Sequence, residues 1–291
     1  LYEDKPIYFD NWDIDMYYVE KSWPVDELVS MRWSEDGPVR TTLELEYRCN
    51  QSTIWQKIHF YANTPRIDFE TKADWKEHQH LLKAEFPVDI HSDAATFEIQ
   101  FGNVTRKVHT NTSCDKARFE SCGQKWMDFS EGHYGVSLLN DCKYGHSVRD
   151  GVIGLTLIKC GVEPNPNADV EMHTFTYALF PHAGTWKEAG TVEESYQLNL
   201  PAYAVRGGQP GTAFSYTAVE PRNVVLETVK QAENGDGVVL RMYECENART
   251  KTVVRLPEGA QRAYLTNLLE EIQEELPIVD GKVTFMTKPF E

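Results

Sequence analysis

Residues 101–145 contain many of the side chains suited to chemistry, but their spacing matches no self-sufficient catalytic motif. The stretch holds three of the six cysteines and is rich in Asn, Asp, Trp and Tyr among glycines. It has no glycine-rich phosphate loop, no paired-cysteine zinc knuckle and no nucleophile elbow. Composition therefore indicates a β-rich protein with a polar, aromatic loop region here.

A second group of interest lies near the start of the chain, where aromatic residues stand among carboxylates. The sequence from Asp10 to Asp13 reads Asp-Asn-Trp-Asp. A tryptophan ring can stack on the C–H face of a sugar while a neighbouring carboxylate accepts hydrogen bonds from the sugar hydroxyls. Packing in the core is the simpler explanation of the aromatic side chains. The carboxylates lack the EF-hand spacing, which argues against calcium.

Two other features contain residue types that bind metals, a pair of histidines and the cysteines. His78 and His80 are two residues apart, which would place them on one face of a strand, although a solvated loop explains them better. The six cysteines include no Cys-x-x-Cys pair. A zinc knuckle is therefore disfavoured, and reduced thiols are expected. The sequence predicts no metal site in this chain.

The charge balance argues against some classes of partner. The 291 residues include 29 Lys and Arg against 45 Asp and Glu, which gives a formal net charge of −16. Such a chain repels phosphate backbones and anionic membranes, so neither nucleic acid nor a membrane is an expected partner. No apolar run approaches the roughly 20 residues of a membrane helix, and no signal peptide is apparent. Because the chain starts at Leu1 without Met, we interpret it as a piece of a longer protein.

Alternation of apolar and polar residues recurs along the first two thirds of the chain and predicts strands. It is strict in residues 41–48 and returns in residues 54–61, 66–72 and 82–90, with turn residues between these segments. Short strands of this period predict a large antiparallel sheet system. In residues 185–198 apolar residues recur every three or four positions, which predicts a helix.

The pattern changes after a glycine-containing segment, residues 203–211, which we expect to be a linker. Five strand-like segments follow and predict a small β-sandwich: residues 223–229, 237–244, 249–256, 262–267 and 282–286. The predicted fold class is all-β, with domains at residues 1–208 and 214–291.

Several segments together resemble the C-terminal half of family 38 glycoside hydrolases, the zinc-dependent retaining α-mannosidases, and especially their cytosolic and bacterial branch. The resemblance lies in YEDKPIYFDNWDIDMYYVEK, in GNVTRKVHTNTSCDKARFESCGQKWMDFSEGHYGVSLLNDCKYGHSVRDG, in TFTYALFPHAGTW and in NVVLETVKQAENGDGVVLRMYE. NLLEE and the terminal KPFE complete it. These segments cover most of the chain in order, and the central block with QKW and NDCKYG is the most specific.

The resemblance implies an enzyme in which an N-terminal catalytic domain and a helical bundle precede the β domains. The catalytic domain would carry the zinc ligands, the Asp nucleophile and the acid, and no segment of this chain matches those motifs. The chain would then be a large antiparallel super-sandwich of the galactose mutarotase-like type followed by a small C-terminal β-sandwich. We expect no catalytic residue and no zinc in it. For the whole protein we expect an α-mannoside or oligosaccharide substrate, the catalytic and helical domains as partners, a cytoplasmic location and a capacity to form homo-oligomers.

The resemblance also points to three loops whose side chains would face the substrate. The candidates are Asp10, Trp12, Asp13, Asn140, Asp141, Tyr144, Asp169 and His173. The first loop is near the family's WDxWD pattern, with Phe9 where Trp is common. The third stands in place of a family Asp-x-Gly-x-His turn, but Glu171 replaces the glycine, so the close backbone approach that glycine permits is in doubt. For each loop, a structural role or an inter-domain contact is the alternative.

Two other functions remain open from the sequence. A non-catalytic carbohydrate-binding or structural module would use the same loops without chemistry. An aldose epimerase would need a His and a Glu that converge on the sugar ring. The residue types are present, without a spacing that pairs them, at His109, His133, His173 and Glu131. A covered interface in the whole protein would leave exposed apolar surface here, and we expect it around Trp12 and Tyr17.

Overall fold

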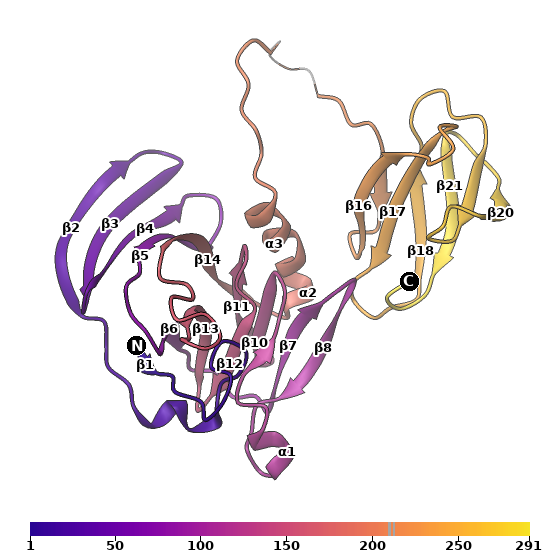
Figure 1. The fold of residues 1–291 in the computed structure, drawn as a ribbon. Coiled ribbons are helices and arrows are strands. Elements are labelled where there is room, and N and C mark those ends of the chain that lie inside the picture. The colour runs from indigo at the N-terminus through magenta and orange to yellow at the C-terminus, as the bar shows by residue number, and fades with distance from the viewer. Residues whose placement is uncertain (209–210, 212) are drawn as a thin grey trace. The chain divides into compact units, whose positions relative to one another are not determined.

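The computed structural model describes residues 1–208, 211 and 213–291. These residues form two compact units, one of Leu1–Glu98 with Val104–Ala202 and one of Ile99–Asn103 with Tyr203–Glu291 (Figure 1). The predicted linker includes residues 209 and 210, which lie outside the described residues. Within the described ranges, no helix has the length and apolar character needed to cross a membrane.

The first unit is built from two antiparallel sheets. The larger has the strand order β2-β3-β4-β5-β14-β11-β10-β7-β8, and the smaller has the order β1-β6-β13-β12-β9. The strands of the larger sheet are β2 Glu27–Asp36, β3 Arg40–Cys49, β4 Ser52–Tyr61, β5 Ile67–Asp74, β7 Ala94–Ile99, β8 Gly102–Lys107, β10 Trp126–Ser130, β11 Tyr134–Asn140 and β14 Met172–Ala183. Those of the smaller sheet are β1 Tyr2–Glu3, β6 His80–Pro87, β9 Ser121–Cys122, β12 Gly145–Arg149 and β13 Val152–Cys160.

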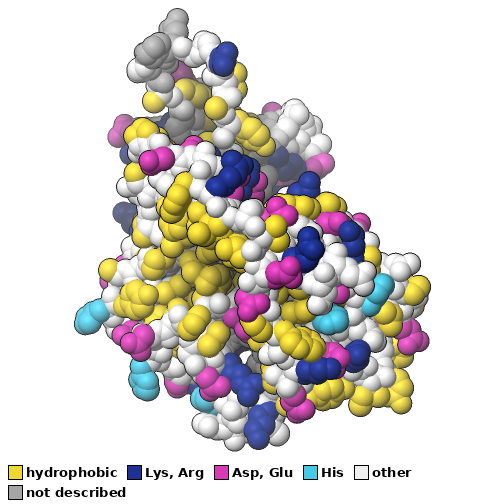
Figure 2. Space-filling view, turned by 90° about the vertical axis from the view of Figure 1, so that its left-hand side faces the viewer, with side chains coloured by type: hydrophobic (Ala, Val, Ile, Leu, Met, Phe, Trp, Pro, Cys, Tyr) yellow, Lys and Arg dark blue, Asp and Glu magenta, His cyan; other side chains and the backbone are white. Residues whose placement is uncertain are grey.

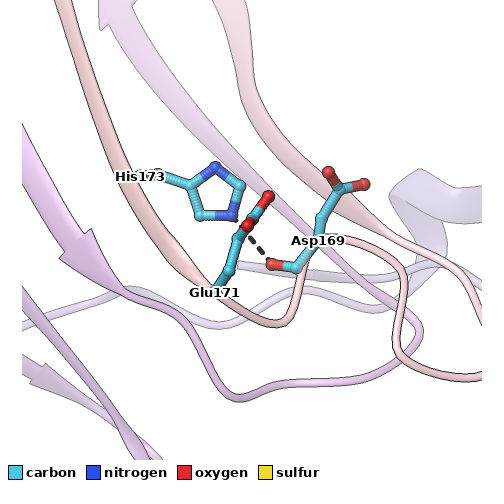
Figure 3. Close-up of side chains that lie close together, drawn as sticks. All are labelled: Asp169, Glu171 and His173. Carbon is cyan, nitrogen blue, oxygen red and sulfur yellow. Dashed lines mark hydrogen bonds between the residues drawn. The ribbon is translucent and has the colours of Figure 1, made fainter.

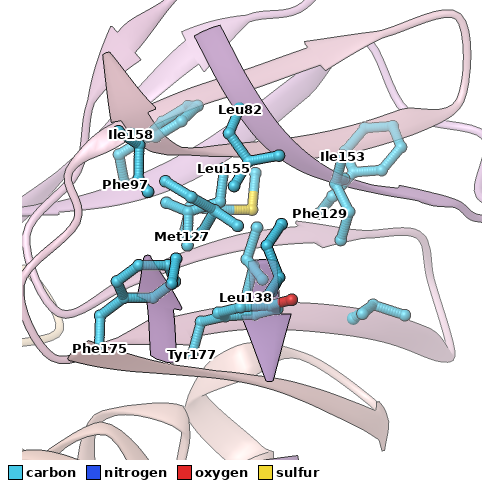
Figure 4. Close-up of a cluster of buried hydrophobic side chains, with 14 of the residues drawn as sticks. Leu82, Phe97, Met127, Phe129, Leu138, Ile153, Leu155, Ile158, Phe175 and Tyr177 are labelled. Carbon is cyan, nitrogen blue, oxygen red and sulfur yellow. The ribbon is translucent and has the colours of Figure 1, made fainter. Parts of the chain in front are cut away.

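The core of this unit lies between the two sheets (Figure 4). Leu82 and Leu155 come from the smaller sheet, and Met127, Leu138 and Phe175 come from the larger one. None of these five side chains is more than 4% exposed. Two sheets that pack their apolar faces together in this way form a sandwich stabilised mainly by the removal of apolar surface from water.

Much of the region that composition marks as a loop, residues 101–145, consists of strands. β8, β10 and β11 lie in it. Trp126, Met127 and Phe129 of β10 are buried, and so is the intervening Asp128. A strand buried on both faces shows no apolar–polar alternation, which explains why the sequence pattern did not reveal it.

The predicted helix over residues 185–198 is interrupted. It consists of α2 Trp186–Ala189 and α3 Thr191–Asn199, separated by Gly190 with a left-handed φ of +78°. Thr185 and Glu188 form a capping box at the start of α2. Gly190 ends α2 in the way that glycine commonly ends helices, a feature that apolar spacing cannot show. The shorter helical segments are η1 Met16–Glu20 and α1 Ser113–Lys116.

The second unit is a small β-sandwich. It contains the sheet β15-β18-β21 and the pairs β16-β17 and β19-β20. The strands are β15 Ala218–Glu220, β16 Val224–Gln231, β17 Val238–Glu244, β18 Thr250–Arg255, β19 Ala263–Thr266, β20 Ile272–Leu276 and β21 Lys282–Thr287. Val254, Leu276 and Val283 form its buried core. The predicted all-β class, a large antiparallel super-sandwich followed by a small β-sandwich, is confirmed, although β15 and β20 were not anticipated.

Candidate functional site

Asp10 anchors the aromatic loop near the start of the chain. Its side chain is 4% exposed. Oδ1 accepts a hydrogen bond from the Glu163 N–H at 2.8 Å, and Oδ2 accepts from the Val162 N–H at 3.0 Å and from Nε2 of Gln79 at 3.1 Å. Burial alone would raise the pKa of Asp10. The hydrogen bonds from Glu163, Val162 and Gln79, together with the charge of Lys159, outweigh it, so the pKa lies below its usual value.

The hydrogen bonds of Asp10 join two loops that are distant in the sequence, the loop around Asp10 and the loop around Glu163. The Asn11 N–H donates to the Glu163 carbonyl at 3.3 Å. At Gly161, a Cβ atom would lie 2.8 Å from the backbone carbonyl carbon of Asp10. Only glycine permits so close an approach of the two backbones. The loop that contains Trp12 is therefore held directly against the loop that leads to Asp169.

Aromatic side chains project from the anchored loop. Tyr8 is 73% exposed and Trp12 is 71% exposed. The Trp12 and Asp13 N–H groups donate to the Phe9 carbonyl at 2.8 and 3.1 Å, and the Phe9 and Trp12 rings lie 5.8 Å apart. The Asp13 carboxylate is also exposed, and its Oδ1 accepts from the Ile14 N–H at 3.0 Å. An exposed indole ring and an exposed carboxylate next to it can stack on a sugar and bind its hydroxyls.

Asp169, Glu171 and His173 form a cluster at the end of the adjoining loop (Figure 3). One ligand atom from each residue lies within 4.8 Å of the others. Nε2 of His173 donates to the backbone carbonyl of Asp169 at 2.8 Å, and the Trp75 N–H donates to the Glu171 carbonyl at 3.0 Å. Glu171, in the place of the family glycine, adds a second exposed carboxylate beside the imidazole.

The donor set of this cluster does not fit the zinc that the resemblance implies. Among the described residues, this is the group of three side chains whose ligand atoms lie close enough together to hold an ion. It offers one imidazole and two exposed carboxylates, whereas catalytic zinc sites use at least two His or Cys ligands held in a fixed geometry. No step through zinc is therefore assigned to the residues of this chain.

The loop that follows β11 is held by Asn140. Its side chain is 1% exposed. The amide Nδ2 donates to the Gln124 carbonyl at 2.9 Å, and Oδ1 accepts from the Lys143 N–H at 2.7 Å. Both ends of the amide thus shape the turn rather than face solvent. Tyr144, by contrast, is 62% exposed and available to a ligand.

Two of the three candidate groups lie at the same end of the larger sheet. The Asp141 N–H donates to the Thr176 carbonyl at 3.1 Å, and the Asp141 carboxylate accepts from the Thr176 N–H at 2.9 Å. Thr176 is on β14, three residues after His173, so this strand carries both loops. The loop of residues 161–171 connects the group of Asp169 and His173 to Asp10, and hence to the loop that contains Trp12.

Sequence reasoning missed the residues that hold these loops together. Gln79 and the backbone of Val162 and Glu163 bind Asp10, and Thr176 binds Asp141. Backbone donors carry no sequence signal.

The residues that an epimerase would need have separate partners. His109 lies 3.5 Å from Asp115, and Glu131 accepts from the His91 N–H at 2.8 Å. His133 is exposed in the turn between β10 and β11. These contacts do not join His109 to Glu131, and the epimerase alternative is not favoured.

The fold and loops define a class: an all-β chain of two units whose exposed aromatic and acidic loop residues are of the type that binds sugars. Residues 1–167 match the model of the glycosyl hydrolases family 38 C-terminal domain, and residues 223–291 match that of the family 38 C-terminal beta sandwich domain. The chain belongs to glycoside hydrolase family 38, of which it represents the C-terminal domains.

Known α-mannosidases align with the whole of this chain. Alpha-mannosidase 2C1 of Homo sapiens is 37% identical over 300 aligned residues, which cover 100% of this chain and 29% of the relative. Alpha-mannosidase G of Dictyostelium discoideum is 33% identical over 100% of this chain and 28% of the relative. This chain thus spans less than a third of the length of either relative. An α-mannosidase from Enterococcus faecalis V583 has the same fold, with a TM-score of 0.77 and 18% identity over 91% of this chain and 35% of that chain.

Proposed function

We propose that the full-length protein hydrolyses terminal α-mannosides with retention, and that this chain completes the sugar site and packs against the catalytic and helical parts of the same polypeptide. The observation that carries the proposal is the 37% identity to human alpha-mannosidase 2C1 along the whole of this chain. The exposed Trp12 and Asp13, on a loop fixed by the buried Asp10, provide the local chemistry for a sugar.

Retention requires two carboxyl groups, one that attacks the anomeric carbon and one that protonates the leaving oxygen. We place both groups outside this chain. Zinc, bound in the catalytic part, would supply coordination of sugar hydroxyls that favours ring distortion. The role left to this chain is to orient the substrate: the Trp12 ring stacks on a sugar face, while Asp13, Asp169 and Glu171 accept hydrogen bonds from its hydroxyls.

We place the protein in the cytoplasm, with a role in mannose metabolism. None of the six cysteines, all of which the structure describes, is in a disulfide, and Cys49, Cys160 and Cys245 are buried. Free thiols are the usual state in a reducing compartment, and this supports the placement.

Replacement of Trp12 by alanine in the full-length protein should lower kcat/KM for an aryl α-mannoside about fivefold, because loss of one stacking contact costs on the order of 1 kcal/mol. The measurement is release of the aryl group by the wild type, the variant and the isolated chain of 291 residues. The isolated chain should show no turnover. Trp55→Ala is a matched control, since Trp55 is 37% exposed on β4 and lies outside the candidate loops. Turnover by the isolated chain, or a full-length protein inert towards α-mannosides, would overturn the proposal.

A further inference from the structure

One end of the nine-stranded sheet carries an apolar face that continues beyond the core. Trp33 of β2 pairs with Leu43 of β3, which pairs with Ile58 of β4. Ile58 pairs with Phe69 of β5, which pairs with Tyr177 of β14. Residues directly opposite one another in antiparallel strands project from the same face. Trp33, Leu43 and Ile58 therefore extend the row of side chains that faces the core.

The smaller sheet covers only part of this row. Phe86 of β6 contacts Phe69 and Tyr177, with ring centroids 5.6 and 6.3 Å apart. Tyr177 is 4% exposed, whereas Trp33 and Met31 of β2 are 63% and 62% exposed. Figure 2 views the side on which β2 and β3 lie in Figure 1 and shows hydrophobic side chains gathered in a hollow. The apolar face is thus open to solvent at this end.

The opposite face of the same strands is charged. Arg32, Glu44, Lys57 and Glu70 form the row across β2, β3, β4 and β5, and Arg32 forms an ion pair with Glu44. The charged face can remain exposed to solvent, whereas exposure of the apolar face to water is unfavourable. β2 is also the edge strand, and all ten of its residues are exposed. A long exposed edge beside a large apolar patch marks an interaction surface.

We propose that this open face is the surface on which another part of the same full-length polypeptide docks. The face is formed by Leu28, Met31, Trp33, Leu43, Ile58 and Phe60, and the rings of Trp33 and Phe60 lie 6.4 Å apart. The inference rests on the proposed function, which makes this chain one part of a longer enzyme. Relatives that match all of this chain leave about 70% of their length outside it, since it spans 29% and 28% of them.

Charge favours an occupant from the same polypeptide over a second copy of this chain. Each copy carries a formal charge of −16. Asp36, at the end of β2, pairs with Thr41, which pairs with Phe60, so its carboxylate projects from the open face. Two such surfaces would repel each other. The occupant we propose is therefore a part of the same polypeptide that presents an apolar surface to this face.

Hydrogen–deuterium exchange of the full-length protein and of the isolated chain tests this surface. Amides of β2 and β3 should exchange at least tenfold more slowly in the full-length protein. Trp33→Glu should shorten the half-life of thermal inactivation of the full-length protein at least tenfold while leaving the unfolding of the isolated chain within its experimental spread. Trp55→Glu is the matched control, because Trp55 is an exposed tryptophan on the opposite face of β4, next to the core-facing Ile54, and it should change the half-life less than twofold.

Equal exchange in both proteins, or equal effects of Trp33→Glu and Trp55→Glu, would overturn the inference. So would protection that grows with protein concentration and is lost in Trp33→Glu, since that result identifies a second copy as the occupant. The inference and the proposed function fail separately. If the full-length protein shows the protection but no mannosidase activity, the docking surface is supported and the proposed function is wrong. If it is active but shows no protection, the proposed function is supported and the docking surface is wrong.

Discussion

Replacement of Asp10 by alanine should lower the free energy of unfolding of the first unit by about 3 kcal/mol. Each hydrogen bond to a charged group contributes about 1.5–3 kcal/mol, and the Asp10 carboxylate accepts three of them. The expected loss is less than their sum because Glu163 is exposed, and water can replace part of its lost contact. Urea denaturation followed by tryptophan fluorescence measures the change.

Asp13→Ala is the matched control for this substitution, because Asp13 lies in the same loop with an exposed side chain. It should change the free energy of unfolding by less than about 0.5 kcal/mol. The loss of free energy of unfolding for Asp10→Asn should lie between those of Asp10→Ala and Asp13→Ala. The amide oxygen of asparagine still accepts a hydrogen bond, but its NH2 group would face backbone donors. A loss for Asp10→Ala no larger than that for Asp13→Ala would show that the carboxylate does not hold the two loops.

The contribution of Asp10 also has a defined pH dependence. Hydrogen bonds, together with the charge of Lys159, outweigh burial and place its pKa below the ordinary value. Its stabilising effect is therefore fully present above the pKa of an unfolded aspartate, about 4, and is lost as the pH falls through the lower folded pKa. The difference between wild type and Asp10→Ala should accordingly shrink only in strong acid.

The fold was readable from the sequence where one face of a strand meets water. Residues 41–48 alternate strictly and form most of β3, because its Leu43 and Leu45 face inward and Glu44 and Glu46 face outward. β10 was not readable, since both of its faces are buried. The amphipathic pattern of β3 predicted a half-buried strand. It did not indicate that the covering sheet stops before β2, which depends on the tertiary arrangement.

Two of the candidate residues hold loops in place, a role that the sequence did not reveal. Asp10 and Asn140 were selected as groups that would meet a sugar, and both are buried and bound to backbone groups of their surroundings. Short polar side chains often serve loops in this way. The backbone donors to Asp10 lie 152 and 153 residues away, a separation that no local pattern encodes. Trp12 and Tyr144 retain exposed surface and remain proposals for substrate contact.

Acidification should destabilise the first unit through His146. This side chain on β12 is completely buried. Burial lowers the pKa of His146 from 6.5 to about 4. In the unfolded chain the His146 imidazole is therefore protonated below pH 6.5, whereas in the folded chain it stays neutral down to about pH 4. Stability is present above that window and is lost as the pH falls through it, by about 2 kcal/mol at pH 5.

His146→Leu should remove this loss, because leucine has no proton to bind and fills an apolar site against Phe97, whose ring lies 6.2 Å from the imidazole. The measurement is the change in the free energy of unfolding between about pH 7.5 and pH 5, a range above the usual carboxylate pKa values. His133→Gln is the matched control, because His133 is exposed and should leave the change as large as in the wild type. If His146→Leu loses as much stability on acidification as the wild type, another group is responsible, and the buried imidazole is not the source of acid sensitivity.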